Sequence, residues 1–292
     1  MNEISQENWL YEISPKKKLI ELNFKEIWRY RDLLLLFVKR DIVTVYKQTI
    51  LGPLWFLIQP LLTSVIFTLV FNGVAGINVP GVPMFLFNLA GITLWNYFSD
   101  CITNTADTFT KNQDLFGKVY FPRIIMPLSV VISNLVKFGI QLLIFIVFYL
   151  IYIGKGIEAR PNIDLFFFPL LLITMAMLGL GIGTIISSLT TKYRDLKFLV
   201  TFGVQLLMYL SAVPYPLSEL VNSSKLQAYP WAIFLIKYNP LTQIIEGFRY
   251  MTLGKGMFNT FNLSISFLVA LSIFLIGLII FNKTEKSFID TV

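Results

Sequence analysis

The chain has 292 residues, of which 55% are apolar and only 14% are charged, whereas soluble domains carry about 25% charged residues. It contains no histidine and a single cysteine, Cys101, so histidine-based catalysis, the usual metal sites and an intrachain disulfide are excluded. The net charge of +7 could suggest nucleic acid as a partner, but the position of the basic residues argues against that and for a membrane.

Six apolar stretches follow one another along the chain, and each is long enough to cross a bilayer. About 20 apolar residues, rising 1.5 Å each in a helix, span a hydrocarbon core of roughly 30 Å. We therefore expect an all-α integral membrane protein with six transmembrane helices and both termini on the same side. The predicted spans are Leu51–Gly73, Met84–Cys101, Ile124–Ile153, Leu165–Leu189, Phe198–Pro214 and Phe261–Phe281.

The basic residues gather on one side of these spans. Of the 24 Lys and Arg residues, 17 lie in the N-terminal segment, in the two loops after the second and fourth spans, or in the C-terminal tail. The positive-inside rule places this side, with both termini, in the cytoplasm. The predicted organisation is a cytoplasmic tail and interface helix over residues 1–50, a six-span domain over 51–281 and a cytoplasmic tail over 282–292.

The N-terminal segment predicts an amphipathic helix before the first span. Leu34, Val38, Ile42 and Val45 recur at helical spacing, and Arg40 lies on another face. This pattern is typical of a helix on the cytoplasmic leaflet with its basic residues toward lipid headgroups. A solvated helix without a lipid role is the alternative.

The loop after the second span predicts a short helix over residues 111–117 that ends at Gly117. Leu115 and Phe116 are apolar residues in this otherwise polar cytoplasmic loop. They can form a docking point for a soluble partner, or they can pack against the membrane end of the bundle. The residues alone leave both interpretations open.

The third span contains three polar residues, Asn134, Lys137 and Gln141, whose spacing places them on one helical face. A charge at membrane depth usually faces a bundle interior or an aqueous path, although Lys137 can instead extend to the headgroups. In the fourth span, Gly179 and Gly183 share a face, which predicts close approach of another helix.

The segment before the last span, about residues 217–250, is external and rich in aromatic residues and proline. Trp231–Ile236 is apolar but too short to cross, and Asn239-Pro240 breaks the pattern, so we expect a re-entrant or interfacial pair of helices. Glu246 and Arg249 are three residues apart and can pair on the second helix, where such a pair is worth little energetically.

Catalytic patterns are missing from the chain. No GxxxxGK[ST] phosphate-binding loop is present, and no two acidic residues lie within two positions of each other. We therefore expect no catalytic site, no metal and no cofactor in this chain.

Several motifs occur in an order that matches a known family. They are Gly52-Pro53-Leu54-Trp55 with Gln59-Pro60, then Gly117-Lys118-Val119-Tyr120-Phe121-Pro122-Arg123, Lys192-Tyr193-Arg194-Asp195 and Tyr238-Asn239-Pro240-Leu241. With six spans and a basic N-terminal helix, the chain resembles the permease subunit of ABC exporters for polysaccharide, of the O-antigen and teichoic acid type. The resemblance covers Lys16 to Phe281.

This resemblance implies a homodimer in the bacterial inner membrane that docks two copies of a separate ABC ATPase, in which ATP and Mg²⁺ act. The substrate would be a polysaccharide linked to undecaprenyl diphosphate. The family's coupling helix matches Lys111, Asn112, Gln113, Asp114, Leu115 and Phe116, and its interface helix matches Phe24–Lys47. Its external gate matches Leu217–Tyr250, with Trp231, Tyr238, Pro240, Glu246 and Arg249.

A diphosphate carrier needs cations near the cytoplasmic interface. The candidates are Arg29, Arg31, Lys39 and Arg40, because arginine suits bidentate phosphate contacts. The alternative is that these basic residues interact with anionic membrane lipid alone. For the whole protein, the alternative function is export of a drug or small lipid by a related ABC permease. A stand-alone channel or secondary transporter is disfavoured, because such proteins usually have several ionisable residues at mid-membrane, where this chain has Lys137, and no inverted repeat is evident.

Overall fold

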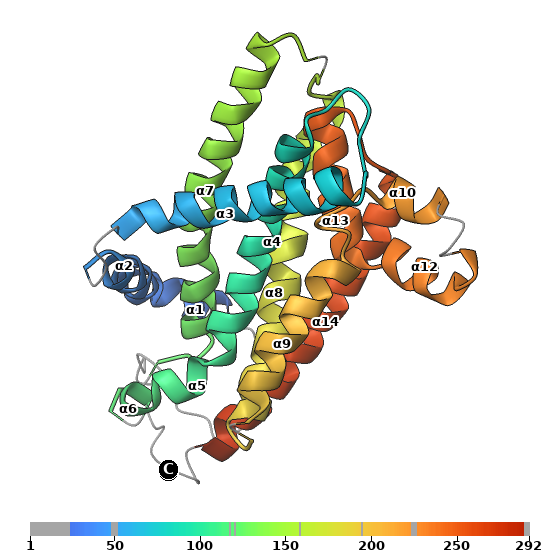
Figure 1. Cartoon of the computed structure of the whole chain (residues 1–292). Helices are drawn as coiled ribbons and strands as arrows, with labels where there is room; N and C mark the ends of the chain where they lie inside the picture. The colour runs from blue at the N-terminus through green and yellow to red at the C-terminus, as the bar shows by residue number, and fades with distance from the viewer. Residues whose placement is uncertain are drawn as a thin grey trace, which may run out of the picture.

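The computed structural model describes residues 24–47, 52–116, 118–119, 121–157, 159–193, 195–222 and 227–288, and within these ranges the chain forms helices and no strand (Figure 1). The expected all-α fold is confirmed. Leu51, Gly117, Tyr120 and Arg194, and the side chains of Val45, Pro53 and Gln113, lie outside the described part.

The helices follow the predicted apolar stretches closely. In chain order they are α1 (Phe24–Arg29), α2 (Arg31–Lys47), η1 (Gly52–Leu54), α3 (Trp55–Phe67), η2 (Thr68–Val74), α4 (Met84–Ala106), α5 (Thr108–Lys111), α6 (Gln113–Phe116), α7 (Ile125–Gly154), η3 (Ile163–Phe167), α8 (Phe168–Thr190), α9 (Leu196–Leu210), α10 (Leu217–Asn222), α12 (Pro230–Lys237), α13 (Pro240–Leu253) and α14 (Thr260–Phe288).

Four of these segments are long and apolar enough to cross a membrane: Trp55–Val74, Ile125–Gly154, Ile163–Thr190 and Thr260–Glu285. The other two predicted spans correspond to α4 and α9, which do not meet both criteria. Helix α4 is long enough but more polar than the four candidate spans, because residues such as Asn88, Asn96 and Asp100 lower its mean hydropathy. Helix α9 is apolar but has 15 residues, which extend about 22 Å.

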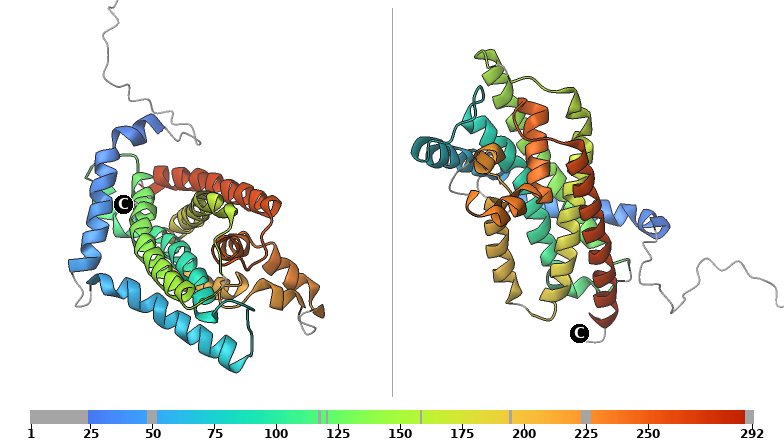
Figure 2. Two further views of the ribbon diagram at one scale, coloured as in Figure 1. Left: turned by 90° about the horizontal axis from the view of Figure 1, so that it is seen from above. Right: turned by 90° about the vertical axis from the view of Figure 1, so that its right-hand side faces the viewer.

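The polarity of α4 has a structural reason, since it packs against α3, α7, α8, α9 and α13 and is buried along most of its length (Figures 1 and 2). A helix enclosed by other helices does not need an apolar surface toward lipid. By contrast, α2 and α3 lie on the outside of the bundle and run crosswise to its axis, as both views in Figure 2 show. Leu62, Ile66 and Leu69 on α3 remain exposed.

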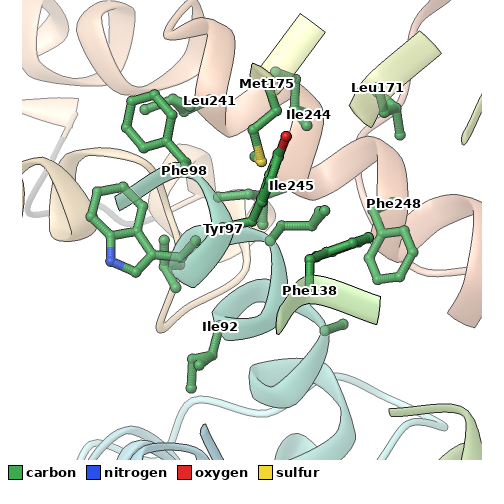
Figure 3. Packing of buried hydrophobic residues seen from close by; sticks show 14 of the residues in the cluster. Ile92, Tyr97, Phe98, Phe138, Leu171, Met175, Leu241, Ile244, Ile245 and Phe248 are labelled. Atoms are coloured by element: carbon green, nitrogen blue, oxygen red, sulfur yellow. The ribbon is translucent and has the colours of Figure 1, made fainter. Parts of the chain in front are cut away.

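The core joins α4 to several other helices, among them α7, α8 and α13. Figure 3 shows Tyr97 and Phe98 of α4 beside Met175 of α8 and Ile245 of α13, with Phe138 of α7 close by. The ring centroids of Tyr97 and Phe138 are 5.4 Å apart, an attractive tilted contact.

Small residues set the spacing of the core helices. A Cβ atom added at Gly179 would lie 2.7 Å from the Cβ of Cys101, and one at Gly183 would lie 2.7 Å from the Cβ of Thr105. The shared face predicted for these two glycines therefore packs directly on α4. The same helix uses Gly181 on another side, where an added Cβ would lie 2.8 Å from the backbone of Phe274 in α14.

A second apolar cluster closes one end of the bundle. It brings together Phe37 of α2, Phe109 of α5, Phe116 of α6, Phe121, and Phe281 of α14. Phe109 and Phe281 stack with centroids 4.7 Å apart. The N-terminal helix, the loop after α4 and the end of α14 are therefore packed into one unit. In Figure 1 the loop after α4 and the end of α14 lie at the lower end of the bundle, and α2 lies above them.

Candidate transport and coupling sites

A seam of polar side chains joins α4 to α7. Lys137 Nζ contacts a carboxylate oxygen of Asp100 at 3.2 Å, and the Lys137 side chain is 24% exposed. One turn away, the Asn96 amide donates to Gln141 Oε1 at 3.4 Å. The three polar residues predicted on one face of α7 thus all contact α4, since Asn134 Nδ2 lies 3.9 Å from Cys101 Sγ.

Sequence reasoning missed Asp100 as the partner of Lys137. The available signal was the spacing of Asn96, Asp100 and Asn104, which recur every fourth residue and so share one face of α4. The ammonium group pairs with a carboxylate between two helices, and Lys137 also lines a cavity at this position.

A cavity of about 530 Å³ opens at one end of this seam. Its walls come from α2, α3, α4, α5 and α7, and they include Arg40, Asn104, Lys111, Asn134 and Lys137. Segments distant in sequence, among them the N-terminal helix and the loop after α4, therefore share a single polar space.

The four candidate diphosphate-binding residues do not form a single site. Arg29, Arg31, Lys39 and Arg40 are all exposed on α1 and α2. Arg31 and Arg40 are nine residues apart, so helical periodicity puts them on opposite faces of α2. Of the four, Arg40 lines the cavity, where its guanidinium contacts Asp41 at 2.8 Å.

The loop after α4 differs from the prediction in two ways. Instead of one helix over 111–117 it forms two single turns, α5 and α6, which Asn112 separates. Asn112 uses its side-chain amide to bond the carbonyl of Thr108 at 2.9 Å, and this contact competes with a continuous helix.

The second difference concerns the proposed docking residues. Phe116 is 9% exposed and packs into the second cluster, with the guanidinium carbon of Arg123 5.1 Å from its ring centroid, while Leu115 is half-buried against the same cluster. An exposed docking point at Phe116 is therefore wrong for this conformation. Of the predicted coupling residues whose side chains the structure describes, Lys111 and Asp114 are exposed.

This loop is attached to the start of α9 through one carboxylate. Asp107 contacts Lys197 Nζ at 2.9 Å and Lys111 Nζ at 3.1 Å, and Thr190 donates a hydrogen bond to the carbonyl of Ala106 at 3.0 Å. Burial raises the pKa of Asp107, but the hydrogen bonds and charges of Lys197 and Lys111 outweigh it and hold the pKa below its usual value.

The segment before the last helix contains a helix break where one was predicted. Helix α12 ends at Lys237 and α13 begins at Pro240, and the Asn239 side chain caps α13 by accepting from the Leu241 N–H at 3.0 Å. Trp231 is 65% exposed and Tyr238 is also exposed, so both rings extend away from the bundle.

The predicted pair in α13 is present, and it is fully buried. The side chains of Arg249 and Glu246 are 0% and 1% exposed, and their Nη1 and Oε1 atoms are 2.9 Å apart. Arg249 also donates to the carbonyls of Ala212 at 2.9 Å, Phe87 at 3.3 Å and Val213. This pair is the buried polar node of the segment, and it joins α13 to α4 and to the end of α9.

Two further contacts surround the Glu246–Arg249 pair, one at each side chain. The Met257 N–H donates to Glu246 Oε2 at 3.1 Å, which occupies the second carboxylate oxygen. Gly91 of α4 lies directly against the guanidinium, because an added Cβ would lie 2.4 Å from Arg249 Nη2. The spacing of Glu246 and Arg249 was visible in the sequence, but their burial depends on elements more than 30 residues away.

The ABC-2 type transporter family matches residues 32–253, which is most of the chain and includes the seam, the loop after α4 and the buried node. The chain belongs to this family. As an ABC-2 permease with several apolar helices of spanning length, it is a multi-pass membrane protein.

Relatives of this ABC-2 permease are named for polysaccharide transport. The O-antigen export system permease protein RfbA of Klebsiella pneumoniae is 29% identical over 260 residues, which cover 89% of this chain and 94% of the relative. RfbA of Myxococcus xanthus is 27% identical and covers 77% and 82%. The polysialic acid transport protein KpsM of Escherichia coli is 21% identical and covers 86% and 93%.

Proposed function

We propose that this ABC-2 permease is the channel-forming subunit of an ATP-driven exporter that moves a lipid-linked polysaccharide of the O-antigen type from the cytoplasm across the bacterial inner membrane. One observation carries the proposal: the match to an O-antigen export permease extends over 94% of that relative and 89% of this chain, well beyond the family core. Nothing in the chain favours export of a drug or small lipid.

The proposed topology has six crossings, formed by α3 with η2, α4, α7, η3 with α8, α9 and α14. For α3 and η2, which are long and apolar enough but lie crosswise to the bundle in this structure, the crossing requires that they turn relative to the other helices. The polarity of α4 supports rather than opposes a crossing, because other helices surround it. The loop after α4, the loop before α9 and the end of α14 lie together at one end of the bundle (Figure 1). Their basic residues favour a cytoplasmic position for this end and for both termini.

The proposed assembly contains two copies of this chain and two copies of a separate ATPase, which supplies ATP and Mg²⁺ chemistry. Apolar side chains on α3 and α9, such as Leu62, Ile66, Phe198 and Phe202, remain uncovered within one chain. They are available to lipid or to a second copy. The exposed edge of the α5–α6 loop, with Lys111 and Asp114, is the proposed ATPase contact.

The substrate carrier in this proposal is undecaprenyl diphosphate, and the basic helices α1 and α2 contact its headgroup or the surrounding anionic lipid. Trp231 and Tyr238 belong to the proposed external gate, since they extend from the short helices that precede the last crossing. Exposed aromatic rings at such a gate give a sliding sugar chain loose contacts that do not trap it.

Deletion of the gene in the source bacterium tests this function. We expect the polysaccharide to disappear from the cell surface and its lipid-linked form to accumulate inside, with export restored by the intact chain only when its ATPase is present. Surface polysaccharide that is unchanged by the deletion would refute the proposal. A deletion that instead alters drug tolerance would support the small-molecule alternative.

A further inference from the structure

We propose that the cavity between α2, α4, α5 and α7 binds a sugar unit of the carrier-linked substrate. This assignment rests on the proposed function. The cavity volume of about 530 Å³ lies within the roughly 300–1,000 Å³ of small-molecule sites. A short stretch of sugar chain fits such a space, whereas a long polymer does not.

The charges around the cavity argue against a multivalent anion as the ligand. Three cations line it, and each one has a carboxylate partner. Arg40 contacts Asp41 at 2.8 Å, Lys111 contacts Asp107 at 3.1 Å, and Lys137 contacts Asp100 at 3.2 Å. Diphosphate sites usually offer basic groups whose charge is not already balanced. Since Asp107 is shared with Lys197, the cations at the cavity exceed the carboxylates by one, and the cavity has many polar groups but no cluster of unpaired cations in the part of its wall that the structure describes.

The neutral groups in the wall match the hydrogen bonding of sugar hydroxyls. The hydroxyls of Thr44, Thr108 and Ser133 each donate to a backbone carbonyl in the preceding turn, at 2.7–2.9 Å, so their oxygen lone pairs serve as acceptors. The amides of Asn104 and Asn134 bring both donors and acceptors to the same wall. A sugar hydroxyl donates and accepts, whereas a phosphate oxygen only accepts, so this mixture favours the sugar.

Part of the wall is apolar, as a sugar ring requires for its C–H face. Phe56, at the start of α3, lies in the wall with its ring centroid 5.0 Å from Lys137 Nζ, and Ile42 and Val130 lie beside it. Aromatic faces carry partial negative charge and attract C–H groups. Polar and apolar surfaces thus meet across one cavity, and α5 of the proposed coupling loop forms one of its sides.

Protection of a cysteine from labelling tests the assignment in the full-length protein reconstituted in nanodiscs. In a Cys101→Ser background, Thr44→Cys places a thiol in the cavity wall on an exposed part of α2, and Ser218→Cys on α10 is the matched control outside it. The labelling rate with a water-soluble maleimide is measured with three additions: undecaprenyl diphosphate that carries a short oligosaccharide, undecaprenyl diphosphate alone, and neither.

We expect the glycosylated carrier, at about ten times its Kd, to slow labelling at position 44 about tenfold while position 218 is unaffected. The bare carrier should leave both rates unchanged. Asn104→Leu in the Thr44→Cys protein should abolish the protection, provided that gel filtration shows an intact fold. Equal protection by the bare carrier would overturn the sugar assignment in favour of a phosphate site, and no protection by either would remove the cavity as a substrate site.

The two levels of the argument fail separately. If cells that lack the chain still display their polysaccharide, the proposed function is wrong, whatever the labelling shows. If export depends on the chain but the glycosylated carrier does not protect position 44, the function stands and only the placement of the sugar is refuted.

Discussion

The buried node in α13 gives the sharpest prediction, which is the effect of Arg249→Ala. The wild-type guanidinium is fully buried, pairs with Glu246 and donates to the carbonyls of Phe87, Ala212 and Val213. Its removal leaves a buried carboxylate without its counter-charge, which costs about 3–5 kcal/mol of unfolding free energy. At about 2–4 °C per kcal/mol, the unfolding midpoint should fall by about 6–20 °C.

Two companion variants separate charge from geometry. Arg249→Lys keeps the positive charge but replaces a planar group with a single ammonium, so it should destabilise the protein less than alanine does. The double variant Glu246→Leu with Arg249→Met removes both charges. It should be less destabilised than either single change, because no unpaired charge remains. Thermal unfolding of the purified protein, followed by tryptophan fluorescence in one detergent, measures all of them.

The reasoning has a clear failure. If Arg249→Ala unfolds within about 1 °C of the wild type, less than the shift expected for even 1 kcal/mol, the pair is not buried as described. If the changes in unfolding free energy of Glu246→Leu and Arg249→Met, each measured alone, add up to that of the double variant, Glu246 and Arg249 are not coupled, and the node is a packing feature rather than an ionic one.

Three further predictions follow from other contacts. Asp107→Asn should destabilise the protein at pH 7 by no more than about 1 kcal/mol, since the partner lysines are exposed. Folding lowers the pKa of Asp107, so the wild-type advantage should disappear as the pH falls below about 3.9 and through the folded-state pKa. Measurement of stability against pH for both proteins tests this. Asp114→Lys should leave the unfolding midpoint unchanged but weaken copurification of the ATPase, and unchanged copurification would remove this edge from the docking surface. Gly183→Ala should cost about 1–3 kcal/mol through overpacking against α4, whereas Gly139→Ala, with no atom within 4 Å, should be neutral or slightly stabilising; midpoints that shift equally would contradict the close approach.

Apolar patterning predicted most of the helices, because a run of apolar residues favours a helix wherever the neighbours are lipid or other apolar side chains. Apolar patterning did not predict the orientation of each helix relative to the bundle. The stretch that begins at Trp55 is apolar enough to cross a membrane, yet it lies crosswise to the bundle, and its composition contains no information on direction. Likewise, the polar residues of α4 are explained by the helices that surround it, which sequence periodicity does not identify.

The candidate sites divide in the same way. The common face of Asn134, Lys137 and Gln141 followed from helical spacing, which is local. The partner of Lys137 and the burial of Arg249 did not follow, since both depend on contacts between segments far apart in the sequence. The apolar character of Phe116 left docking and packing within the chain both open, and in this structure Phe116 packs into a cluster of the same chain.

Helix α9 has one further consequence for how these sites are connected. Its first turn is tied to the loop after α4 through Lys197 and Asp107, and the residues just beyond its last turn, Ala212 and Val213, accept hydrogen bonds from Arg249. An α-helix is stiff along its axis, and 15 residues extend about 22 Å. Helix α9 therefore connects the loop after α4 directly to the buried node of α13.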